Sequence, residues 1–104
     1  MKTDTYPRII WPEDFDDRAA YEIEMKDWLG GVKVELAEGL IYSLFFFDPV
    51  RLKQDLESMV ALGRPCLDEP GLIVVPSVTV ENIEKSVTFL ARRDYFSHLR
   101  PNSD

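Results

Sequence analysis

Few side chains in the sequence can act as nucleophiles, bases or metal ligands. The chain contains one cysteine, Cys66, and one histidine, His98, which lies close to the C-terminus. One cysteine and one histidine cannot form an intramolecular disulfide or supply a thiolate zinc cluster. We interpret Cys66 as a small apolar residue in a loop and His98 as a solvated residue. The sequence therefore favours a protein without metal or cofactor, and one that is not an enzyme.

Carboxylates are concentrated in one segment of the chain. Residues 13–27 contain seven acidic and two basic residues, a net charge of −5, whereas the whole chain has a net charge of −7. The tight cluster of Glu13, Asp14, Asp16 and Asp17 lacks the glycine and the distal glutamate of an EF-hand loop. Two interpretations remain: a solvated acidic loop, and a docking surface that attracts a basic protein partner by charge complementarity.

A second candidate site lies where two expected strands lead directly into two expected helices. Asp48 follows the first of these strands, and Ser77 and Thr79 follow the second. If the strands are parallel, these residues and Arg51 meet at one sheet edge beside two helix N-termini, where small anions bind. The alternative is that Asp48 and Thr79 are ordinary N-caps and that Arg51 pairs with Asp55. The carboxylate of Asp48 repels an anion, which favours the alternative.

Capping residues and apolar periodicity predict two helices. Asp48 suits an N-cap and the following proline suits the first helical position, so a helix is expected over 49–62, with Gly63 as its stop signal. The apolar stripe of this helix consists of Leu52, Leu56, Met59 and Val60. A second helix is expected to begin after Thr79, with a stripe formed by Val80, Ile83, Val87, Leu90 and Ala91.

Strands are expected at 8–11, 32–36, 40–47 and 72–75. Segments 32–36 and 40–47 form a hairpin around Gly39, which suits a turn with a positive φ angle. Three consecutive phenylalanines end the second arm of this hairpin, and 72–75 is apolar without alternation. Both patterns are typical of strands that are covered on both faces of a sheet.

Segment 19–28 fits two templates equally well. Ala19, Tyr21, Ile23 and Met25 alternate with polar residues, as in a half-buried strand, whereas Tyr21, Met25, Trp28 and Leu29 fit one helix face. Asp16 or Asp17 can cap such a helix. We favour the strand, because the glycine pair at 30–31 then connects it by a turn to the next strand.

The resulting prediction is a single α+β domain over residues 1–104, with flexible tails at 1–7 and 101–104. The element order is β-(β)-β-β-α-β-α, which forms a mixed sheet of four or five strands with two helices. Two helices do not suffice to cover both faces of the strands at 40–47 and 72–75. A second subunit can supply the missing cover, so a homodimer and a monomer both remain open.

The acid excess also limits the classes of partner. A pI near 4.6 disfavours binding to nucleic acid and to anionic membranes, which need a basic face. The longest apolar run, 40–47, is too short to cross a bilayer, and the N-terminus has no apolar leader, so a cytoplasmic location is expected. The leading hypothesis is a small acidic binding or interaction module of the inhibitor, immunity or chaperone-like kind. The alternatives are a structural or regulatory homo-oligomer and a small-anion binder or enzyme at the strand-end site.

Overall fold

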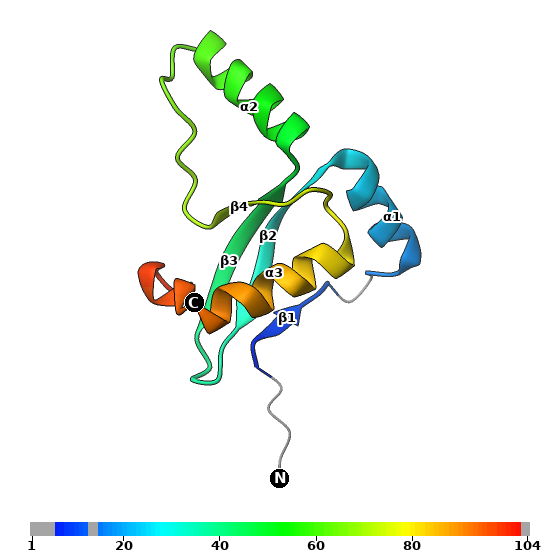
Figure 1. Ribbon diagram of the computed structural model, residues 1–104, viewed down its shortest axis with the longest axis vertical. Coiled ribbons are helices and arrows are strands. Elements are labelled where there is room, and N and C mark those ends of the chain that lie inside the picture. Colours follow the sequence, from blue (N-terminus) through cyan, green and yellow to red (C-terminus); the bar gives the residue numbers. More distant parts are fainter. Residues whose placement is uncertain (1–5, 13–14, 103–104) are drawn as a thin grey trace.

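The computed structural model describes residues 6–12 and 15–102 (Figure 1). Its elements are, in chain order, β1 (Arg8–Ile10), α1 (Asp17–Lys26), β2 (Trp28–Glu35), β3 (Ile41–Phe47), α2 (Pro49–Ala61), β4 (Leu72–Val74), α3 (Val80–Arg92) and the short 3-10 helix η1 (Tyr95–His98). The strands form one sheet in the order β1-β2-β3-β4, in which only the β3–β4 pair is parallel. The predicted α+β domain with a mixed sheet is confirmed, but the described chain has four strands and three α-helices rather than two.

The expectation of a strand at 19–28 is wrong, because α1 occupies most of this segment. The carboxylate of Asp16 accepts a hydrogen bond from the backbone N–H of Ala19 at 2.9 Å, which caps the helix at its start. Asp27 ends the helix in the left-handed conformation, with a φ angle of 66°. Only Ile23 is buried along α1, so the alternation of apolar residues in the sequence reflects exposed side chains rather than the two faces of a strand.

The glycine pair at 30–31 forms a bulge inside β2 instead of the expected turn between two strands. The register of β2 against β3 shifts between Leu29 and Val32, and Gly31 has a φ angle of 69°. The predicted hairpin of β2 and β3 is confirmed beyond the bulge, where Gly39 has a φ angle of 84°. The bulge allows β2 to continue as far as Trp28, where it pairs with the last residue of β3.

The hydrophobic core lies on one face of the sheet. Its strand residues alternate along the hairpin, as expected for a strand with one buried face. They are Val32, Val34, Tyr42, Leu44 and Phe46. Helix α3 lies across this face (Figure 1) and contributes Ile83 and Val87, while Phe96 of η1 closes the core beside Tyr42.

The opposite face is much less covered, which corrects the prediction that β3 and β4 are buried on both sides. Phe45 and Phe47 are only half-buried there, and Val74 is exposed. Helix α2 matches the predicted 49–62, but it projects beyond the end of β3 (Figure 1) and none of its residues is buried. The long segment 62–71 brings the chain back to β4 without forming a helix or strand.

The C-terminal segment is attached to the free edge of β3. The backbone N–H of Asn102 donates to the carbonyl oxygen of Ile41 at 2.6 Å, and the Asn102 side chain contacts the Ser43 hydroxyl. Strand β4 pairs with β3 only at Phe45–Phe47, and the contacts of Asn102 cover the preceding part of the same edge. The chain past η1 thus protects part of an edge that would otherwise be open to pairing with another chain.

The chain returns to β3 at Gly71, where there is no room for a side chain. A methyl group at this position should therefore lower the stability of the fold. A Cβ at Gly71 would lie 2.6 Å from the carbonyl oxygen of Ser43, and its φ angle of 83° is left-handed. We expect Gly71→Ala to lower the free energy of unfolding by more than about 2 kcal/mol, because strain and a backbone clash combine. Urea denaturation measures this loss.

Gly63→Ala is the matched control. Gly63 also has a positive φ angle, 92°, but a Cβ there has no heavy atom within 4 Å. This variant carries the backbone strain alone and should cost about 1 kcal/mol. Equal losses for the two variants would show that the close approach of Gly71 to β3 is not needed.

Candidate functional site

The parallel pairing of β3 with β4 places the two strand ends of the expected site side by side, with Phe47 opposite Val74. Asp48 accepts a hydrogen bond from the backbone N–H of Arg51 at 2.8 Å and caps α2. The Thr79 hydroxyl accepts from the backbone N–H of Asn82 at 3.0 Å and caps α3, while the Asn82 side chain donates to the carbonyl oxygen of Ser77. Both helix starts are therefore satisfied by the chain itself, an arrangement that favours capping over anion binding.

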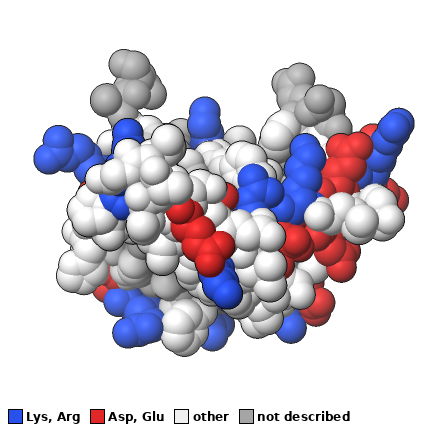
Figure 2. Space-filling view, turned by 90° about the horizontal axis from the view of Figure 1, so that it is seen from above, with Lys and Arg blue, Asp and Glu red and all other residues white. Residues whose placement is uncertain are grey.

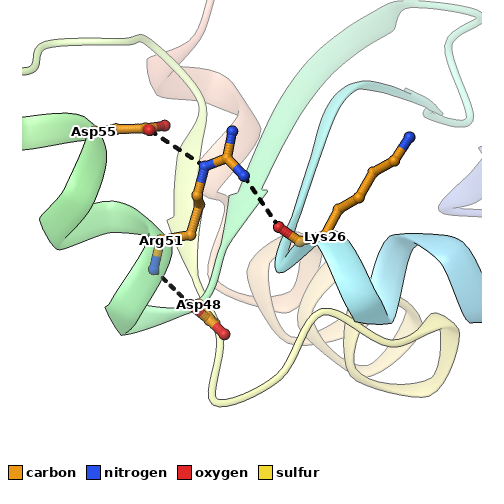
Figure 3. Close-up of polar contacts among 4 residues, drawn as sticks. All are labelled: Lys26, Asp48, Arg51 and Asp55. Atoms are coloured by element: carbon orange, nitrogen blue, oxygen red, sulfur yellow. Dashed lines mark hydrogen bonds and ion pairs between the residues drawn. The ribbon is translucent and has the colours of Figure 1, made fainter. Parts of the chain in front are cut away.

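Arg51 connects α2 to the body of the molecule (Figure 3). Its Nε donates to Asp55 one turn further along the helix at 3.2 Å, as expected from the sequence, and its Nη1 donates to the carbonyl oxygen of Lys26 at 3.3 Å. The guanidinium also lies 5.6 Å from the centroid of the Trp28 ring, a cation–π contact. Arg51 thus holds the start of α2 against the junction of α1 and β2.

Asp27 is a member of this cluster that the sequence does not reveal. The backbone N–H of Asp48 donates to its carbonyl oxygen at 3.0 Å, and the two carboxyl groups are neighbours that share a hydrogen bond when Asp27 is protonated. This hydrogen bond raises the pKa of Asp27; partial burial and the negative charge of Asp48 act in the same direction, and Arg51 opposes them. Only the tertiary fold places the end of α1 beside the start of α2.

The acidic segment is only partly described. Glu13 and Asp14 lie outside the described residues, Asp16 is the N-cap of α1, and Asp17 is exposed in the first turn. Figure 2 looks down on the end of the molecule from which α2 projects, and charged residues of both signs gather on the side of α1. The prediction of a docking surface for a basic partner thus rests on a mixed rather than a purely acidic surface.

The largest unexplained feature is the apolar side of α2. We call residues 49–71, which comprise α2 and the segment that returns to β4, the arm. A groove of about 390 Å³ lies between α2 and this returning segment, and we call it the arm groove. It is lined by Leu52, Leu56, Pro65, Cys66, Leu67 and Leu72. Cys66 is exposed at this groove rather than packed into the fold as a plug.

The predicted stripe of α2 runs along the arm groove and continues past it. Leu52 and Met59 are half-buried, whereas Leu56 is 39% and Val60 56% exposed. Leu62, just after the helix, is 79% exposed. The arm therefore exposes several large apolar side chains on an element that makes few contacts with the rest of the described chain.

Metal-binding groups and membrane-spanning helices were sought in the described part of the chain. Within 6–12 and 15–102, no group of three or more histidine, cysteine or acidic residues is arranged to hold a metal ion. No helix in this part of the chain is long and apolar enough to cross a membrane. His98 is exposed at the end of η1.

Removing the Arg51 side chain should loosen the arm. Arg51→Ala loses a charged hydrogen bond, a bond to the Lys26 carbonyl and a cation–π contact, so we expect about 1–2 kcal/mol less stability. Amide hydrogen exchange should accelerate in α2 more than in α3. Lys85→Ala, which removes an exposed ion pair with Glu81, is the control and should cost less than about 0.5 kcal/mol. Equal effects of both variants would contradict the role of Arg51.

The raised pKa of Asp27 predicts a dependence of stability on pH. A carboxyl whose pKa is raised by folding stabilises the fold below its unfolded pKa, and this contribution is lost as the pH rises through the folded pKa. Asp27→Asn keeps a hydrogen bond to Asp48 without a second charge. We therefore expect it to raise the denaturation midpoint at neutral pH, with an advantage that shrinks in mild acid.

Asp94→Asn is the control for this variant. Asp94 has the same left-handed conformation, with a φ angle of 59°, so it reports the backbone preference of asparagine without Asp48 as a neighbour. A pH-independent gain for Asp27→Asn, equal to that of Asp94→Asn, would refute the interaction between Asp27 and Asp48.

Comparison with known proteins identifies no relative of this chain. The chain matches no protein-family model, no curated protein and no solved structure.

Proposed function

We propose that the protein is a small interaction module that binds a protein partner through the apolar surface of its arm. One observation carries this proposal: α2 has thirteen residues and none of them is buried. Helices shorter than about 12–15 residues are marginal in water and obtain most of their stability from packing of an apolar face. A partner that covers Leu56 and Val60 supplies this packing.

The charge distribution supports an apolar rather than an electrostatic contact at the arm. Helix α2 carries two basic and two acidic residues, Arg51, Lys53, Asp55 and Glu57, so its net charge is zero in a chain of net charge −7. In Figure 2 the middle of this end of the molecule is largely uncharged and is crossed by a short row of charged residues, while further charged residues lie around its margin. A neutral surface with exposed leucine and valine is suited to a partner with its own apolar patch.

Substitution of Val60 tests the proposal. Val60→Glu places a charge on the exposed stripe. We therefore expect it to weaken the binding of a partner that the immobilised wild-type protein retains by more than about tenfold in affinity, which is roughly 1.4 kcal/mol. Phe89→Glu is the matched control, because Phe89 on α3 has the same exposed fraction as Val60, 56%. Quantitative comparison of material retained from the native host measures the effect.

Two outcomes would contradict binding through the arm. If both variants retain the same partner equally, the apolar surface of the arm is not the binding site. If binding is instead abolished by high salt and by Asp17→Asn, the partner is basic and docks on the acidic segment. Binding that survives salt and is lost only in Val60→Glu supports the proposal.

A further inference from the structure

We infer that the partner covering the arm is a second copy of this chain, with α2 of one copy packed antiparallel against α2 of the other about a two-fold axis. This inference rests on the proposed function, since it names the occupant of the same apolar surface. Three observations of this chain favour a second copy over an unrelated partner. They are the exposed apolar side chains of the arm, the neutrality of α2 and the order of charges along it.

The arm exposes several large apolar side chains. Leu56, Val60 and Leu62 are 39%, 56% and 79% exposed. None of the thirteen residues of α2 is buried, and the helix projects beyond the sheet (Figure 1). A second copy that covers these side chains removes apolar surface from water.

The neutrality of the arm allows self-association in an acidic protein. Two copies of a chain with net charge −7 repel each other in most orientations. The arm is an exception, because the charges on α2 sum to zero and its stripe is apolar. Association through the arm also leaves the acidic residues of α1, among them Asp17, exposed to solvent.

The order of charges along α2 is opposite to that of the other two helices. Asp17 lies in the first turn of α1 and Glu81 in that of α3, and both helices have a basic residue in their last turn, as the helix dipole favours. On α2 the basic pair Arg51 and Lys53 precedes the acidic pair at 55 and 57. Within one helix this order allows the Arg51–Asp55 pair but opposes the helix dipole, whereas an antiparallel copy brings the acidic half of one helix beside the basic half of the other.

The geometry of an antiparallel pair makes this complementarity specific. Lys53 and Glu57 are one turn apart on the same flank of α2, and neither makes an ion pair with another described residue. A two-fold axis at the level of Asp55 and Leu56 places Lys53 of each copy beside Glu57 of the other. Leu56 and Val60 then meet the stripe of the second copy in an isologous contact.

Sedimentation velocity over a range of concentrations tests the inference with the full chain. We expect the wild-type protein and Phe89→Glu to form a dimer of twice the 12.0 kDa mass, and Val60→Glu to remain a monomer. Lys53→Glu and Glu57→Lys should each raise the dimer dissociation constant about tenfold, because two attractive contacts become repulsive. Lys85→Glu on α3 is the charge control and should leave it unchanged.

Mixing the two charge variants gives the decisive result. Lys53→Glu and Glu57→Lys are complementary to each other in an antiparallel pair, so their mixture should recover the wild-type dissociation constant. Dimers that form equally well with Val60→Glu, or a mixture that associates no better than each variant alone, would overturn the inference. Circular dichroism of each variant verifies that its helices are retained.

A failed inference is distinguishable from a failed proposed function. A wild-type protein that stays monomeric at every concentration excludes the second copy. In that case, the binding of another protein to Val60→Glu and to Phe89→Glu is compared. This comparison decides whether the arm binds any partner.

Discussion

The parallel pairing of β4 with β3 is the constraint on which the rest of the structure depends. Parallel neighbours cannot be joined by a tight turn, so the chain must leave the sheet after Phe47 and return at Leu72 through a crossover. The crossover is the arm, and the hydrogen bond from the backbone N–H of Phe45 to the carbonyl oxygen of Gly71 attaches its end. Because α3 covers only one face of the sheet, the other face and the arm lack an equivalent cover from the residues that the structure describes.

The start of the arm is held by polar contacts rather than by a core. Arg51 bonds to the Lys26 carbonyl and stacks near Trp28, and Asp48 shares a hydrogen bond with protonated Asp27. Two neighbouring carboxyl groups at such a junction reduce stability when both are ionised. The attachment of α2 is therefore weaker than that of α3, which is held by the buried residues Ile83 and Val87. A weakly attached helix with an apolar side is suited to binding that also completes its packing.

The acid excess and the apolar arm lie on different elements. Exposed carboxylates gather with basic residues around α1, whereas α2 is neutral and presents leucine and valine. The net negative charge opposes non-specific association of the protein. The uncharged apolar side of α2 remains available for a specific contact. The Thr79 hydroxyl and the backbone carbonyl of Ser77 serve the start of α3 in this arrangement, since both accept hydrogen bonds from Asn82.

Local patterns were enough to predict the elements that carry their own capping and periodicity. Helix α2 with its Asp48 cap, helix α3 with its Thr79 cap, and the hairpin around Gly39 follow from residues close together in the sequence. Segment 19–28 matched two periods equally, and the choice of a helix depended on the Asp16 cap and on the left-handed Asp27, which let the chain turn directly into β2.

The sequence by itself determined which residues are apolar and at what spacing, including the stripe of α2, because periodicity is a property of the local chain. It could not determine what that stripe contacts. The sequence predicted that the strands at 40–47 and 72–75 would be covered on both faces, but the crossover carries α2 past the end of the sheet, and no residue of α2 is buried. The pairing of Asp27 with Asp48, and of Arg51 with the end of α1, was likewise decided only in the tertiary structure, since each joins residues that no local pattern relates.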